Sequence, residues 1–88
     1  ESVAELLGHI KAKRFTDMRK WVAQNVDNDP VKLFRKIYDK LYEVLEPQSI
    51  PQAVIIIADY SYKSAFVVDQ EVNIVACLTE LMMECRWK

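Results

Sequence analysis

Glycine and proline are scarce in this chain, and that scarcity constrains the fold more than any other feature. The 88 residues include one Gly and three Pro. Folds rich in β-strands need several tight turns, and those turns depend on Gly and Pro. The hydrophobic fraction of 51% and the charged fraction of 28% are those of an ordinary globular protein. We therefore predict an all-α fold, a single compact bundle of about five helices over residues 1–88.

Local start signals place these helices along the chain. Ser2 and Glu5 have the spacing of a capping box, in which each side chain satisfies an orphan backbone N–H. Thr16 is a candidate N-cap for a second helix, and Asp29-Pro30 has the form of a helix start after the break at 25–30. Ser49 is expected to cap a fourth helix. The predicted helices span about Val3–Lys11, Thr16–Gln24, Pro30–Leu45, Ile50–Lys63 and Val68–Arg86.

Apolar residues recur at helical spacing in the longer segments, and they predict which faces are buried. The buried face of the third helix is predicted to comprise Leu33, Phe34, Ile37, Tyr38, Leu41 and Leu45. That of the last helix is predicted to comprise Val68, Val72, Val75, Leu78, Met82 and Cys85, with Ile74 and Leu81 widening it. A stripe this wide exceeds what one packing partner needs, so it indicates a second contact surface.

The segment 54–57, Val-Ile-Ile-Ile, is compatible with either a strand or a helix. Its β-branched residues suit a buried strand. A lone strand cannot satisfy its backbone, and no partner strand is evident elsewhere in the sequence. We therefore predict a helix here, buried on several sides at the centre of the bundle.

Whether the two cysteines can form a disulfide indicates the cellular compartment. Cys77 and Cys85 fall on one predicted helix, about 12 Å apart at roughly 1.5 Å rise per residue. A disulfide needs Cα atoms within about 7 Å, so these cysteines cannot pair with each other. Free thiols among apolar neighbours fit a reducing, cytoplasmic location, and the longest apolar run, Ala53–Ala58, is too short to span a bilayer.

Catalytic and ligand-binding signatures are missing from the sequence. The single His9 has no cysteine, serine or carboxylate placed to work with it, and two distant cysteines do not make a zinc site. Gly8 stands alone, so phosphate-binding glycine loops are absent. Asp27 and Asp29 lack the acidic ladder of a calcium loop. We expect no catalytic residue, no cofactor and no metal in this chain, and no enzyme activity of its own.

Charge is unevenly distributed along the chain. Residues 1–42 contain nine Lys/Arg and six Asp/Glu, whereas residues 43–88 contain three and seven. The basic residues of the first part are Lys11, Lys13, Arg14, Arg19, Lys20, Lys32, Arg35, Lys36 and Lys40. They are compatible with solvated helix faces, or with a free-standing nucleic-acid-binding or adaptor module that uses the N-terminal helices.

The second half of the sequence resembles a known family. The segments that carry the resemblance are 47–52 (Pro-Gln-Ser-Ile-Pro-Gln), 57–63 (Ile-Ala-Asp-Tyr-Ser-Tyr-Lys), 69–74 (Asp-Gln-Glu-Val-Asn-Ile) and 78–81 (Leu-Thr-Glu-Leu). They are similar to the closing helices of sliding-clamp-loader small subunits, AAA+ ATPases of the replication factor C type. The tailed-bacteriophage version is the most similar, because Ala65-Phe66 stands where cellular relatives often carry a Gly.

The resemblance implies a function for the chain. It would be the C-terminal collar domain of a larger protein, an expectation that the absence of an initiator Met at Glu1 also suggests. Collar domains of several subunits pack into a ring, in homo- and hetero-oligomers. ATP and Mg would bind the parent's ATPase module, and the parent complex would engage the sliding clamp and primer–template DNA during phage DNA replication in an infected bacterial cell. The predicted subunit interface comprises Tyr60, Tyr62, Phe66, Met82, Met83 and Trp87.

Overall fold

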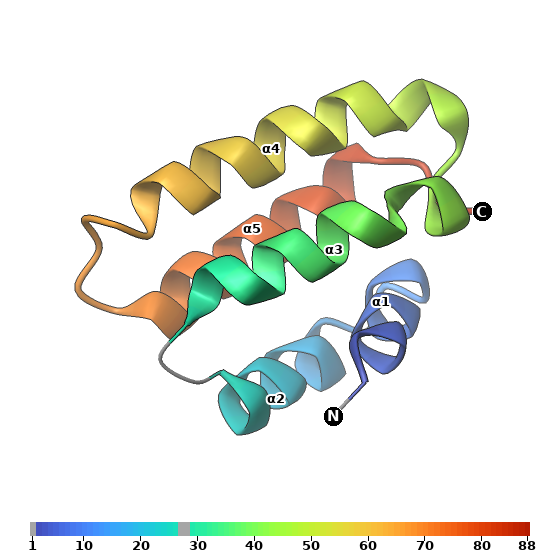
Figure 1. Cartoon of the computed structure of the whole chain (residues 1–88). Coiled ribbons are helices and arrows are strands. Elements are labelled where there is room, and N and C mark those ends of the chain that lie inside the picture. Colours follow the sequence, from blue (N-terminus) through green and yellow to red (C-terminus); the bar gives the residue numbers. More distant parts are fainter. Residues whose placement is uncertain (1, 27–28) are drawn as a thin grey trace.

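Five α-helices make up most of the molecule (Figure 1). A computed structural model describes residues 2–26 and 29–88, and 79% of it is helical. The helices are α1 (Val3–Lys11), α2 (Phe15–Asn25), α3 (Pro30–Val44), α4 (Ile50–Lys63) and α5 (Gln70–Glu84), with a short 3₁₀ turn, η1 (Pro47–Ser49), before α4. The all-α prediction is therefore confirmed.

The three long helices run side by side, and the two short ones cover one side of this layer (Figure 1). α4 and α5 form an antiparallel hairpin joined by the loop 64–69, and α3 packs along α4. α1 and α2 contact each other, and both pack against α5. α1 also packs against α3, which closes the bundle.

Buried apolar side chains form one continuous cluster that draws on all five helices. A fully buried Leu, Ile or Phe contributes about 1.5–3 kcal/mol relative to an exposed one, so this cluster is the main source of stability. The largest fully buried side chains are those of Leu6, Ile10, Met18, Phe34, Ile37, Leu41, Leu45, Ile74, Leu78 and Leu81.

The ambiguous segment 54–57 is helical, as predicted, and lies within α4. Ile56 and Ile57 are buried, but Ile55 is 70% exposed. The expectation of burial on several sides is wrong for Ile55, because α4 packs mainly against α3, α5 and η1, and Ile55 lies on the side of α4 that these elements leave uncovered.

Helix starts follow the predicted capping rules only in part. The Ser2 hydroxyl accepts from Ala4 N at 3.1 Å, as expected of an N-cap. Thr16 is not an N-cap, because Lys13 adopts a left-handed backbone with φ 59° and α2 begins two residues later, at Phe15. Pro30 lies in the first turn of α3, as predicted, while Asp27 and Asn28 of the preceding break lie outside the described residues.

The buried faces of α3 and α5 also differ from prediction. Tyr38 is 43% exposed, because it lies beside the α3–α4 contact. α5 begins at Gln70, where Asp69 accepts from Val72 N at 3.2 Å. Val68 therefore lies before the helix and is fully exposed, and Val72 is 64% exposed on the outer face.

The last residues of the chain are hydrogen-bonded to the segment that ends α3 and follows it. Glu46 N donates to Arg86 O and Lys88 N donates to Val44 O, each at 2.9 Å. The buried Ser49 hydroxyl, expected to cap α4, instead accepts from Arg86 N at 2.8 Å. Ser49 thus holds the C-terminal segment in place and makes no side-chain cap bond to α4.

Both cysteines are free thiols, as predicted, and both are buried. Burial, followed by the nearby Glu80 carboxylate, raises the pKa of Cys77 to about 12. Burial also raises the pKa of Cys85, with Glu84 contributing next. Among the described residues, no helix has the length and apolarity needed to cross a bilayer.

Candidate interaction surfaces

The predicted interface residues lie at two opposite ends of the α4–α5 hairpin rather than in one patch. Tyr62 and Phe66 lie where α4 ends, with ring centroids 5.1 Å apart, and each is 69% exposed. Met83 lies in the last turn of α5, at the other end of the hairpin (Figure 1), and is 72% exposed.

The other three predicted residues are committed to contacts within the chain. Met82 is buried in the core. Trp87 is partly buried, and its Nε1 donates to Leu81 O at 3.1 Å. The Tyr60 hydroxyl donates to Glu80 at 2.9 Å, a bond that connects α4 to α5. Burial, followed by this bond, raises the pKa of Tyr60 from 10.0 to about 12.

The outer face of α5 is an uncovered, weakly polar ridge. Val72, Ala76, Thr79 and Met83 share one side of the helix at spacings of three and four residues. Val72 and Met83 are exposed, and Ala76 and Thr79 are partly exposed. The helix carries three glutamates and no Lys or Arg, and Lys13 Nζ approaches its C-terminal end, where it donates to Met82 O.

A second surface lies between α1 and α3, above Gly8. It is a hollow of about 210 Å³, with an apolar floor made by Ala4, Leu7, Gly8 and Val44. Gly8 is the only glycine of the chain, and it lies inside α1 without a positive φ. A glycine at such a position costs about 1 kcal/mol relative to alanine. A Cβ added here would meet nothing within 4 Å, so packing within the described chain does not require the glycine.

Three lysines surround this hollow, which we call the Gly8 groove. Lys11 belongs to α1, Lys40 to α3, and Lys88 to the C-terminal segment. Glu43 is the single acid that lines it, at 3.9 Å from Lys40. The groove is therefore apolar at its base and basic at its rim.

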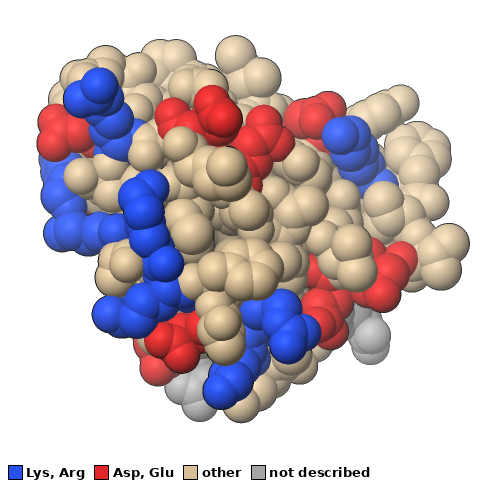
Figure 2. Space-filling model, turned by 180° about the vertical axis from the view of Figure 1, so that it is seen from behind, with Lys and Arg blue, Asp and Glu red and all other residues tan. Residues whose placement is uncertain are grey.

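The adjacent surface extends this basic character. A hollow that shares Lys11 with the Gly8 groove is lined by Lys13 and Arg86, with Glu46 as its single acid. Figure 2 shows the molecule from behind, where Lys and Arg gather toward the left and lower edges, the side of α1 and α2. The centre of that view is largely uncharged.

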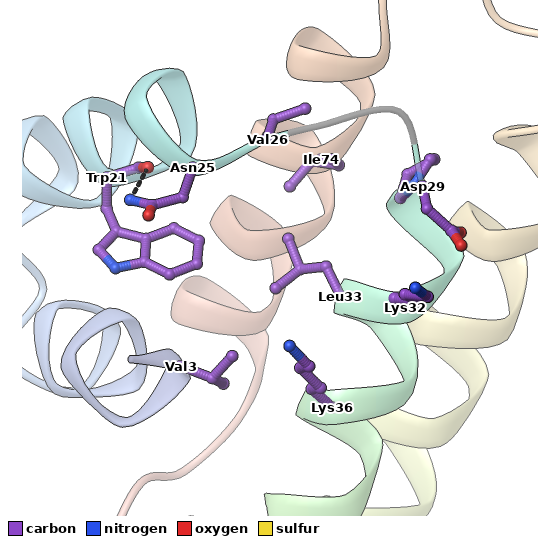
Figure 3. A pocket seen from close by; sticks show the side chains of 10 residues that line it. Val3, Trp21, Asn25, Val26, Asp29, Lys32, Leu33, Lys36 and Ile74 are labelled. Carbon is purple, nitrogen blue, oxygen red and sulfur yellow. Dashed lines mark hydrogen bonds between the residues drawn. The ribbon is translucent and has the colours of Figure 1, made fainter. Parts of the chain in front are cut away.

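A third hollow, of about 200 Å³, lies where α2 and α3 approach α5 (Figure 3). Lys32 and Lys36 border it from α3, and Asn25 Nδ2 donates to Trp21 O at 2.8 Å on the α2 side. The indole Nε1 of Trp21 is buried without a hydrogen-bond partner among the described residues. It points toward α1 and not toward the lysines (Figure 3), so the hollow has no built polar site.

Groups of three or more metal-ligating side chains were not found among residues 2–26 and 29–88. Comparisons with protein-family models and with curated protein sequences find no match. The class that the structure defines is an all-α helical bundle with two uncovered surfaces of unlike character, the outer face of α5 and the Gly8 groove.

Proposed function

We propose that this chain is an oligomerisation domain, the collar of a sliding-clamp-loader ATPase subunit that holds subunits in a ring during phage DNA replication. The observation that carries the proposal is the uncovered apolar surface of the α4–α5 hairpin. Large apolar side chains of this hairpin are exposed by 64% or more at Ile55, Tyr62, Phe66, Val68, Val72 and Met83. These side chains support the proposal because large apolar groups left exposed in a small domain are typical of protein–protein contact sites.

The resemblance of segments 47–52, 57–63, 69–74 and 78–81 to clamp-loader collar domains supplies the rest of the proposal. A five-helix bundle is the fold that this resemblance implies. In the parent protein an ATPase module binds ATP and Mg, and the assembled complex engages the sliding clamp and primer–template DNA. This chain contributes contacts between subunits, and the catalytic residues lie in the ATPase module.

Nucleic-acid binding by the N-terminal helices is a second candidate, favoured by the basic edge in Figure 2. Much of that charge is compensated locally. Arg14 pairs with Asp17 at 3.2 Å, and Arg35 pairs with Asp39 at 3.1 Å. A footprint of phosphate contacts would give binding to duplex DNA at low salt, with a steep loss of affinity as salt rises. The absence of binding in a low-salt titration would eliminate this candidate.

Alanine substitution tests the oligomerisation proposal. Phe66→Ala and Met83→Ala should each raise the dissociation constant of self-association, measured by sedimentation equilibrium, because they remove exposed apolar contacts. Phe15→Ala is the matched control, since Phe15 is 44% exposed at the start of α2 and belongs to neither helix of the hairpin. Thermal melts of all three should stay near that of the wild type. Unchanged association for both hairpin variants would contradict the interface assignment.

The ATPase part of the proposal has a separate test. Sequencing the gene upstream of the Glu1 codon should reveal a continuous reading frame with a Gly-rich loop that ends in Gly-Lys-Ser/Thr. A frame that opens immediately before Glu1 would contradict the clamp-loader assignment and leave a helical interaction domain.

A further inference from the structure

We propose that the Gly8 groove of one copy receives the outer face of α5 from a second copy of this chain. The inference rests on the proposed oligomerisation and specifies which two surfaces meet. The outer face of α5 is the ridge Val72, Ala76, Thr79 and Met83. The Gly8 groove is lined by α1, α3 and Lys88, and no residue of α5 lines it.

Gly8 supplies the first argument. Its missing side chain weakens α1, and the described residues contain nothing that would clash with a Cβ there. A glycine in a helix also allows another backbone to come close. The space in front of Gly8 is open in the single chain, so the element that comes close belongs to another molecule. Ala76 and Thr79 are small, and an α5 ridge centred on them can lie close to α1.

Charge complementarity supplies the second argument. Lys11, Lys40 and Lys88 surround the groove, against one acid, Glu43. α5 carries Glu71, Glu80 and Glu84 and no basic residue. Opposite potentials on two surfaces favour their encounter and disfavour contact between like surfaces. Two α5 ridges would repel each other, and so would two groove rims.

Apolar complementarity is the third argument. The floor of the groove is formed by small and aliphatic residues, and Met83 projects from the ridge with 72% of its surface exposed. Methionine is unbranched and flexible, and it fills irregular apolar spaces well. A nucleic-acid backbone would satisfy the lysines but would leave the apolar floor unused.

The two surfaces differ, so the contact is heterologous: each copy uses its ridge on one neighbour and its groove on the other. A contact of this kind builds a ring if the rotation closes and a filament if it does not. The contact therefore predicts assembly beyond a dimer, with the same interface repeated at every junction.

A charge exchange tests the pairing in the full chain. In the groove variant, Lys11→Glu and Lys40→Glu reverse the rim; in the ridge variant, Glu80→Lys and Glu84→Lys reverse α5. Each variant alone should remain monomeric in sedimentation velocity, because its groove and ridge then carry like charges. An equimolar mixture should assemble again, since every junction between the two variants joins opposite charges. Thermal melts confirm that each variant is folded.

Gly8→Ala provides an independent test, because it should stabilise the fold and weaken the assembly. The melting temperature should rise by roughly 4–8 °C, because alanine favours the helix. The dissociation constant of assembly should rise at least about tenfold, since a methyl group blocks the close approach. Ala23→Leu is the control for surface bulk, as Ala23 is exposed on α2, and it should leave assembly unchanged.

The outcomes separate this inference from the proposed function. If the wild type assembles and the groove variant and Gly8→Ala assemble equally well, the groove is not the contact, and the oligomerisation proposal survives with another surface. If the mixture of charge variants stays monomeric, the pairing is wrong. If the wild type is monomeric at every attainable concentration, both proposals fail. Binding of a duplex DNA oligonucleotide that is lost in the groove variant, without self-assembly, would overturn the inference in favour of nucleic-acid binding.

Discussion

Lys13 and Met82 are joined by a hydrogen bond that spans 69 positions of sequence, with Lys13 Nζ donating to Met82 O at 2.8 Å. Met82 lies in the last turn of α5, where backbone carbonyls lack helical partners and the helix dipole favours a positive charge. Lys13 reaches this carbonyl from a left-handed backbone conformation between α1 and α2. The bond therefore connects the short N-terminal helices to the C-terminal end of the long layer.

Two substitutions of Lys13 should separate the contribution of the hydrogen bond to stability from the cost of the left-handed backbone conformation. Lys13→Met removes the donor and keeps the strained backbone, so the free energy of unfolding should fall by about 1 kcal/mol. Lys13→Gly also removes the donor but relieves a left-handed strain of about 1–2 kcal/mol. Urea unfolding should therefore place Lys13→Gly nearer the wild type than Lys13→Met. The reverse order would mean that the conformation of Lys13 is not costly.

Ser49→Ala should loosen the C-terminal segment. Its hydroxyl is buried and accepts from Arg86 N in a part-buried hydrogen bond, so its loss should cost about 0.5–1.5 kcal/mol. Hydrogen exchange of the Arg86 amide should accelerate more than that of amides in α2. Thr16→Ala is the comparison, because Thr16 lies inside α2 and caps nothing, so it should cost less than about 0.5 kcal/mol. A loss typical of a removed N-cap at Thr16 would contradict the observed start of α2.

The two thiols should resist modification in the folded chain. Cys77 is fully buried and Cys85 is 6% exposed, and burial raises the pKa of both, so little thiolate is present at neutral pH. A thiol-reactive reagent should label both residues rapidly in denaturant and slowly without it. Ser49→Ala should accelerate labelling of Cys85 more than labelling of Cys77, because Cys85 precedes Arg86, whose amide the Ser49 hydroxyl binds. Rapid labelling of Cys77 in the native state would contradict its placement in the core.

Alkaline pH should weaken the α4–α5 hairpin through Tyr60. The folded pKa is raised from 10.0 to about 12, so the native state favours the neutral phenol. The stabilisation is complete below pH 10.0 and is lost as the pH rises through about 12. In urea unfolding, the stability difference between the wild type and Tyr60→Phe should be constant below that range and shrink within it. Glu80→Gln keeps a hydrogen-bond acceptor without the charge and should reduce the pH dependence.

Local patterns in the sequence predict the helices better than they predict helix ends or exposed faces. The bounds of α1 and α4 agree with prediction, because a capping serine precedes α1 and a proline lies in the first turn of α4. Thr16 and Ser49 have the sequence pattern of N-caps, but neither caps a helix. The left-handed backbone at Lys13 makes α2 begin before Thr16, and the Ser49 hydroxyl accepts from Arg86 N instead.

Exposed faces were harder to predict because apolar residues of α5 lie on most sides of the helix. Val72 and Leu78 were both expected to be buried, but Val72 lies on the outer face and only Leu78 faces the core. Spacing alone cannot tell which part of a wide apolar stripe meets the rest of the chain. The Gly8 groove was not predicted, although a glycine inside a helical pattern was a signal for it.

Amide and methyl NMR spectra of the wild-type chain, recorded over a dilution series, test the central claim most directly. The account predicts that resonances of Gly8, Val72 and Met83 shift together with concentration, while those of the core residue Phe34 stay fixed. Spectra that do not change with concentration would contradict assembly through these surfaces. Shifts confined to α2 would contradict them equally, because they would place the contact elsewhere.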